Sequence, residues 1–218
     1  MSKIKAVIFD MDGVLIDAKE WHYQAMNEAL AQFGFTITRA DHLSRYDGLP
    51  TKKKLELLSQ LEGFPRELHD AVSQLKQQLT IELVERECSP KFQHVRALFC
   101  LHRGGYTLGV ASNSVRATVR RMMSLAGLNT YLHFQLSNED VVHPKPHPEI
   151  YLRAAELARV TPAECVVIED NHHGIEAARA AGTHVLAVSG TADVTYEHIE
   201  AFIASLSIPA HAASPHAA

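Results

Sequence analysis

Short apolar runs that end abruptly in polar or charged residues constrain this chain more than any other feature. The first run covers residues 6–9 and is followed at once by Asp10, Met11, Asp12 and Gly13. Such a run is typical of a strand buried on both faces of a parallel sheet. Ligands of open α/β sheets bind at the carboxyl ends of the strands. The pattern therefore predicts a central strand that delivers carboxylates to a ligand-binding edge.

Three later segments repeat this design, and each is followed by a helical pattern. They lie at residues 106–111, 165–168 and 184–188. Apolar residues in the following segments are spaced by three and four, as in Val115, Val119 and Met122. Strands that alternate with helices through short links predict a Rossmann-like, doubly wound parallel α/β sheet.

Residues 18–88 break this alternation, because they contain helical patterns but no convincing strand. The expected helices cover residues 21–33, 52–61 and 65–86. We interpret the segment as a helical cap domain, inserted after the first strand and placed above the ligand-binding edge. Hinges near residues 16–18 and 89–91 would let the cap close and exclude bulk water.

The chain therefore divides into two expected domains and a tail. Residues 1–17 together with 89–208 form the core domain, and residues 18–88 form the cap. Residues 209–218 are rich in Ala, Pro and His, so we expect a flexible tail.

Composition limits the partners and the compartment of the protein. The net charge of -4 gives no general attraction for a polyanion, so we expect no nucleic acid partner. No apolar run approaches the roughly 18 residues that a membrane span needs, and no leader pattern opens the chain, so we expect no membrane association and a cytoplasmic location. The three cysteines are too few and too scattered for a disulfide framework or a zinc cluster.

The first strand ends in a pair of carboxylates with a chemical use. Asp10 and Asp12 are two residues apart, so their side chains point the same way if the strand geometry continues. Such a pair suits a metal ion or acid/base catalysis, and Gly13 permits a turn that aims both groups at a ligand. A turn with solvated carboxylates explains these residues equally well, so the segment alone decides little.

Further polar residues follow the other strands of the predicted sheet. Each has an ordinary explanation by itself, as a helix cap or a solvated loop residue. Together they would converge on one crevice at the sheet edge. They are Ser112, Asn113, Lys145, Glu169 and Asp170.

In order and spacing these segments resemble the four motifs of the haloacid dehalogenase superfamily. The motifs are FDMDGV at residues 9–14, Ser112-Asn113, Lys145-Pro146, and Glu169-Asp170 followed by Gly174. They span nearly the whole chain. The resemblance is closest to the branch with a helical cap between the first two motifs, which includes β-phosphoglucomutase, phosphoglycolate phosphatase and sugar phosphatases.

The resemblance implies a role for each motif residue. Asp10 would be the nucleophile and Asp12 the general acid/base, while Ser112 and Lys145 would bind phosphate, with Gly13 and Asn113 lining the substrate site. Mg²⁺ would be held by Asp10, the Asp12 carbonyl and Asp170, with Glu169 as a further ligand or an acceptor behind it. These roles make physical sense, because a divalent cation and an ammonium group offset the repulsion between a carboxylate and a phosphate dianion.

Further candidate residues lie in the cap. His22 matches the position of a histidine that contacts the active site in β-phosphoglucomutase, although a packed helix histidine fits as well. Gly48 and Lys52 belong to the segment that sets specificity in this branch. Three consecutive lysines point around a helix, so at most one or two of Lys52, Lys53 and Lys54 can face the substrate. We interpret His143, His147 and the His172-His173 pair as ordinary histidines, not as a transition-metal site.

We predict a Mg²⁺-dependent phosphatase for a small phosphorylated metabolite, a sugar or polyol phosphate, acting through an aspartyl-phosphate on Asp10 as a monomer or weak dimer. A phosphosugar mutase is the alternative within the family, but Thr51 replaces the arginine that clamps its second phosphate. A dehalogenase is a weaker alternative, because that reaction does not use a second carboxylate at the position of Asp12. Phosphonoacetaldehyde hydrolysis would need a cap lysine, for which Lys52 or Lys53 is available, but Asp12 again argues against it. A catalytically silent phosphate-binding module is the alternative from another class.

Overall fold

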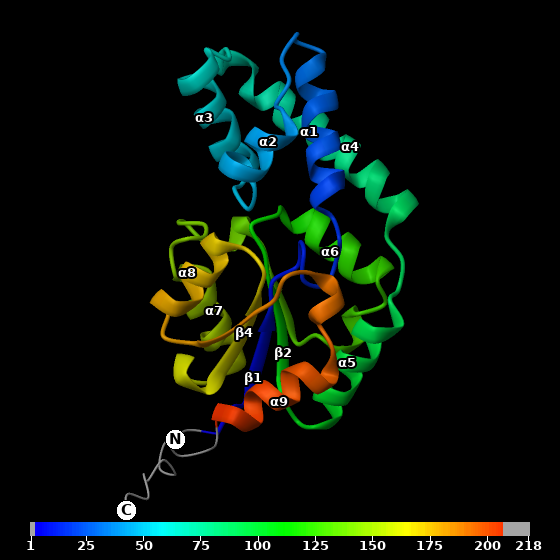
Figure 1. Cartoon of the computed structure of the whole chain (residues 1–218), viewed down its shortest axis with the longest axis vertical. Coiled ribbons are helices and arrows are strands. Elements are labelled where there is room, and N and C mark those ends of the chain that lie inside the picture. Colours follow the sequence, from blue (N-terminus) through cyan, green and yellow to red (C-terminus); the bar gives the residue numbers. More distant parts are fainter. Residues whose placement is uncertain (1–2, 207–218) are drawn as a thin grey trace, which may run out of the picture.

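The fold is built on one five-stranded sheet. The computed structural model describes residues 3–206. All strands are parallel and lie in the order β3-β2-β1-β4-β5, so β1 is central (Figure 1). Phe9 at the end of β1 is paired with Val110 on β2 and with Ile168 on β4. The predicted Rossmann-like fold class is confirmed. The strands are β1 (Ala6–Phe9), β2 (Thr107–Ala111), β3 (Phe134–Leu136), β4 (Cys165–Glu169) and β5 (His184–Ala187).

Helices cover both faces of this sheet. Successive strand residues point to opposite sides, so apolar side chains on each face must be buried. Val7 and Phe9 face a cluster formed with α5 (Phe92–Arg103), α6 (Arg116–Leu125) and α9 (Tyr196–Leu206). Ala6 and Ile8 face a second cluster formed with α7 (Glu149–Ala158) and α8 (His172–Ala180). Burial on both faces explains why the strands read as continuous apolar runs.

A separate helical layer stands beyond the carboxyl ends of the strands (Figure 1). Its apolar core is its own and includes Met26, Leu30, Leu55, Leu58 and Phe64. The helices are α1 (Lys19–Ala31), α2 (Arg39–Asp41), the π-helix η1 (His42–Tyr46), α3 (Thr51–Glu62), the 3-10 helix η2 (Arg66–Leu68) and α4 (His69–Glu87). We keep the name cap for these helices. The domain bounds remain a prediction, and the expected tail at residues 209–218 lies outside the described residues.

Strand β3 was not predicted from the sequence. β3 has only three residues, too few for an apolar run to stand out, and it is placed by pairing with β2. Among the described helices, none has the length and apolar character that crossing a bilayer would take.

The cap also buries a histidine without a polar partner. Within residues 3–206 neither ring nitrogen of His42 has a hydrogen-bond partner, and the side chain is buried. Burial, with a smaller effect of the Lys54 ammonium, lowers the pKa of His42 to about 4. The folded protein therefore holds this histidine in its neutral form.

This histidine predicts a specific loss of stability in acid. Below the ordinary pKa of 6.5 the unfolded chain takes up a proton that the folded chain refuses, so stability falls between pH 6.5 and about 4. In urea titrations, the advantage of His42→Phe over the wild type should grow by about 1–2 kcal/mol from pH 7 to pH 4.5. The exposed control His143→Phe should show no such growth. A difference that stays constant with pH would contradict this account of His42.

Candidate active site

A buried lysine joins three strand ends at the ligand-binding edge of the sheet. The Nζ atom of Lys145 lies 2.6 Å from Asp10 Oδ1 and 2.6 Å from Glu169 Oε1, and it donates a hydrogen bond to the Ala111 carbonyl at 2.8 Å. Lys145 is only 4% exposed. Its backbone N–H donates to Asn113 Oδ1 at 3.1 Å, which places the lysine loop against the end of β2. The convergence that the strand ends suggested is therefore present.

Asp10 occupies a site where its charge is costly. Burial and the nearby carboxylate of Glu169 raise the pKa of Asp10 well above its ordinary value, while the Lys145 ammonium works in the opposite direction. Burial alone would lower the pKa of Lys145, but the carboxylates of Asp10 and Glu169 raise it. A single ammonium group here faces two buried carboxylates, so an additional cation would favour the ionised form of Asp10.

Three carboxylates at this edge fit such a cation. Ligand oxygens of Asp10, Glu169 and Asp170 lie within 4.8 Å of one another. Within residues 3–206, the buried Oδ1 of Asp170 has no hydrogen-bond partner, while its Oδ2 lies 2.7 Å from Lys19 Nζ. A Cβ atom on Gly13 would come within 2.0 Å of Asp170 Oδ2, so only glycine fits there. An all-oxygen set with an unsatisfied carboxylate suits a hard cation such as Mg²⁺.

Glu169 differs from the other two carboxylates because its oxygens already have donors. Besides Lys145, the Tyr151 hydroxyl donates to Oε1 at 2.6 Å, and the backbone N–H of Asp170 donates to Oε2 at 3.1 Å. A Cβ on Gly174 would lie 1.7 Å from Oε1, so the third residue of α8 must be a glycine. These contacts describe an acceptor that positions Lys145.

Asp12 turns its side chain toward the cap instead of the carboxylate cluster. His22 Nε2 lies 3.1 Å from Asp12 Oδ1, and the Ser114 hydroxyl donates to Oδ2 at 2.8 Å. On its far side, His22 Nδ1 lies 3.2 Å from Lys76 Nζ on α4. Burial alone would raise the pKa of Asp12, but His22 and the hydrogen bond from Ser114 lower it. In this arrangement Asp12 is ionised and accepts hydrogen bonds.

The cap loop is fastened to the core by two asparagines. Asn113 Nδ2 donates to the Gly48 carbonyl at 3.0 Å, and Asn171 Nδ2 donates to Asp47 Oδ2 at 3.1 Å. Gly48 has a φ of 73°, and a Cβ there would lie 2.6 Å from Asn171 Oδ1. Ser112 is buried beneath this loop, with its Oγ accepting from the Ser114 N–H at 3.0 Å. The structure thus presents the cap in contact with the core.

A cavity of about 280 Å³ lies between the cap and the sheet edge. Most of the residues expected at the site line it, namely Asp10, Asp12, His22, Gly48, Lys52, Ser112, Asn113, Lys145 and Glu169. Gly13 and Asp170 lie beside it in mutual contact. Lys52 is exposed at its border, whereas Lys54 is buried in it.

Several polar residues at the site were missed by the sequence analysis. They are Lys19, Ser114, Lys76, Tyr151 and Asn171. Ser114 and Asn171 are neighbours of motif residues, so proximity in sequence could have found them. Nothing in the sequence distinguishes Lys76 or Tyr151 from other residues on amphipathic helices.

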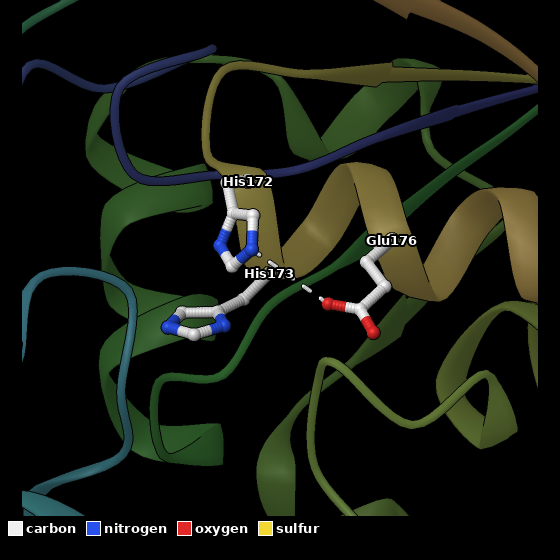
Figure 2. A group of neighbouring side chains, drawn as sticks. All are labelled: His172, His173 and Glu176. Atoms are coloured by element: carbon white, nitrogen blue, oxygen red, sulfur yellow. Dashed lines mark ion pairs between the residues drawn. The ribbon is translucent and has the colours of Figure 1, made fainter.

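A second group of possible metal ligands lies at the start of α8. His172, His173 and Glu176 offer ligand atoms within 4.8 Å of one another (Figure 2). Glu176 lies one helical turn after His172 and was not among the candidates expected from the sequence. Side chains of His172 and Glu176 are 79% and 59% exposed, and their ion-pair distance is 3.8 Å. Solvated side chains on a helix account for this loose group.

Comparison with known proteins identifies the family. The model of the haloacid dehalogenase-like hydrolases matches residues 7–188. The chain is 29% identical over 198 residues to the pyrophosphatase PpaX of Bacillus mycoides, covering 87% of this chain and 85% of the relative. This chain belongs to the haloacid dehalogenase-like hydrolase family, which confirms the resemblance and the expectation of an enzyme of the hydrolase class.

Solved structures agree on the fold. A β-phosphoglucomutase from Clostridium difficile superimposes with a TM-score of 0.79 at 23% identity, covering 93% of this chain and 98% of the other. CbbY from Rhodobacter sphaeroides, solved in complex with phosphate, gives 0.78 at 23% identity, with 86% and 87% covered. At such identities the likeness speaks for the fold alone.

The burial of Lys145 predicts a large effect on stability. Replacing Lys145 with Met leaves two carboxylates buried without their common partner, so the free energy of unfolding at pH 7 should fall by about 3–5 kcal/mol. The control Lys5→Met removes a pair with Glu164 from a lysine that is 57% exposed, and should cost at most about 1 kcal/mol. Urea unfolding measures both. Equal effects of the two substitutions would show that Lys145 does not organise the site.

Proposed function

We propose that this protein is a Mg²⁺-dependent phosphatase that hydrolyses a small phosphomonoester through an aspartyl-phosphate on Asp10. The observation that carries the proposal is the placement of the Asp10 carboxylate. It lies 2.6 Å from Lys145 Nζ, among further carboxylates, at the floor of a cavity under the cap. The Lys145 ammonium and the cavity give the Asp10 carboxylate what it needs to approach an anionic phosphate ester. An aspartate with a purely structural role would need neither.

Mg²⁺ would be held by the side chains of Asp10 and Asp170 and by the Asp12 carbonyl. When bound, the ion neutralises charge on the reacting phosphoryl oxygens. It would also favour the ionised form of Asp10, which burial opposes. Glu169 would not bind the ion but would hold Lys145 in place, because the oxygens of Glu169 already accept hydrogen bonds from protein donors.

The reaction would proceed in two displacements. The Asp10 carboxylate attacks phosphorus in line as the bond to the ester oxygen breaks, and Asp12 donates a proton to the departing alkoxide. Water then attacks the phosphorus of the aspartyl-phosphate while Asp12 takes a proton from that water. The bond between phosphorus and Asp10 breaks, and inorganic phosphate leaves. Asp12 needs a proton for the first step, and an anionic ester nearby would raise its pKa toward that requirement.

Binding and exclusion of water fall to the surrounding residues. Lys145 and the Ser112 hydroxyl would contact phosphate oxygens, with Asn113 keeping the Lys145 loop and the cap loop together. Contacts from Gly48 and Asp47 to the core seal the cavity when the cap is closed. Sealing strengthens every electrostatic interaction inside and restricts water to the second step.

The acceptor of the phosphoryl group separates a phosphatase from a mutase. A mutase must hold a second phosphate while its sugar reorients, and the cap loop has Thr51 where the related mutase has an arginine. This absence favours water as acceptor, although one structural neighbour is a β-phosphoglucomutase. Glucose 1-phosphates distinguish the two, because a mutase converts them to an isomer and a phosphatase releases inorganic phosphate. The name of the PpaX relatives adds inorganic pyrophosphate to the substrates worth testing.

The proposal predicts complete dependence on Asp10. With Mg²⁺ and a panel of sugar phosphates, phosphoglycolate, pyrophosphate and p-nitrophenyl phosphate, the wild type should release phosphate. Asp10→Asn should lose roughly 10³-fold or more in kcat/KM, and the exposed control Asp70→Asn should match the wild type. Turnover by Asp10→Asn near the wild-type rate would refute the covalent mechanism, and no turnover by the wild type would favour a silent binding module.

Metal binding is predicted to be visible without catalysis. Mg²⁺ at 100 times its Kd should stabilise the folded protein by about 2.7 kcal/mol, which raises the midpoint of thermal unfolding by roughly 5 °C. Excess EDTA should reverse the shift. Asp170→Asn should lose most of it, whereas the exposed control Glu176→Gln should keep it. An undiminished shift in Asp170→Asn would place the cation elsewhere.

A further inference from the structure

Lys54 is a buried cation that the proposed chemistry does not use. It lies in the first turn of α3, is only 7% exposed, and lines the same cavity as Asp10. Within residues 3–206 its ammonium group forms no hydrogen bond or ion pair. The carboxylates of Asp47 and Asp12 act on it only from beyond ion-pair distance. An ammonium group largely removed from water without a direct anionic partner is destabilising, so its presence requires a reason.

The other lysines of the cavity show how unusual this is. Lys145 lies against two carboxylates, and Lys19 lies against Asp170 and Asp47. In the described part of the chain, the Lys76 ammonium contacts the imidazole of His22 and no carboxylate. Burial, together with a smaller effect of the nearby Lys54 ammonium, lowers the pKa of Lys76 to about 7. The cap therefore carries two adjacent cations that repel each other.

The positions of Lys54 and Lys76 indicate which part of a substrate they would contact. Lys145 and Asp10 define the phosphoryl end at the floor of the cavity. Lys76 is connected to Asp12 through His22, by contacts of 3.2 Å and 3.1 Å, so it lies on the side of the proton donor. The proton donor serves the leaving oxygen. Lys54 and Lys76 therefore lie beyond the ester bond, over the leaving group.

We propose that Lys54, with Lys76 beside it, binds a second anionic group, a carboxylate or a phosphate, on the leaving-group part of the substrate. The inference rests on the proposed phosphatase function and narrows its substrate class. A cavity of about 280 Å³ limits the molecule to a few carbon atoms between the two anionic ends. Neutral sugar and polyol monophosphates would leave the Lys54 ammonium unpaired, so they should be poor substrates.

Matched pairs of esters test this directly. Phosphoglycolate is compared with 2-hydroxyethyl phosphate, which replaces the carboxylate by a neutral hydroxymethyl group. The bisphosphate of 1,3-propanediol is compared with its monophosphate. The wild type with Mg²⁺ should prefer the doubly anionic member of at least one pair by roughly 10- to 100-fold in kcat/KM. Which pair shows the preference distinguishes a carboxylate from a phosphate.

Variants then assign the preference to Lys54. In Lys54→Met the ratio of kcat/KM values within the preferred pair should fall toward 1, and in Lys54→Arg, which keeps the charge, part of the preference should remain. Lys53→Met is the matched control, because Lys53 is the preceding residue of the same helix, is exposed and does not line the cavity. It should leave the ratio unchanged.

Thermal unfolding supplies a readout that does not depend on turnover. Lys54→Met removes an unpaired buried charge, so its midpoint should rise by about 2 °C or more. Lys53→Met should stay within about 1 °C of the wild type. A fall in the midpoint of a folded Lys54→Met variant would mean that the ammonium already has a stabilising partner, and this would overturn the inference.

The outcomes separate the two proposals. If the wild type hydrolyses none of the four esters and none of the wider panel, the phosphatase function fails and the inference fails with it. If it hydrolyses both members of each pair equally well, only the inference fails. An equal loss on both members in Lys54→Met would place Lys54 at the transferred phosphoryl group and would likewise refute a site for a second anion.

Discussion

The contact of one ammonium group with two carboxylates is the interaction on which the site depends. Lys145 approaches Asp10 and Glu169 at 2.6 Å each and is shielded from water by the sheet edge and the helices around it. Such a triad needs partners for its remaining lone pairs and protons, and the Ala111 carbonyl and the Tyr151 hydroxyl provide two of them. Adjacent parallel strands make this possible, because their carboxyl ends reach the same edge side by side.

Charge is divided across the cavity in a way that the fold by itself does not require. The floor carries the carboxylates of Asp10, Glu169 and Asp170, while the roof carries Lys54 and Lys76. Each half is electrostatically incomplete in the free protein, and each would be completed by a ligand of opposite sign. A folded protein that tolerates such charges gives up stability for function.

The cap contributes more than a cover. Its first helix brings His22 to Asp12, its loop reaches the core through Asn113 and Asn171, and its two later helices bring the roof lysines. Contact between the cap and the core therefore assembles the side of the site where a leaving group would lie. In the proposed reaction, the core by itself would provide only the side that binds the phosphoryl group.

The sequence by itself determined the fold class and the set of residues at the sheet edge. Continuous apolar runs identify strands buried on both faces, and the polar residues that follow them must meet where parallel strands end. Only the tertiary structure decided what lies across the cavity. Lys54 and Lys52 are indistinguishable in a run of three lysines, yet one is buried and the other exposed, because the rotation of α3 against its neighbours selects the inward position. Likewise, Lys76 and Tyr151 reach the site through packing between helices distant in sequence, a relation that no local pattern contains.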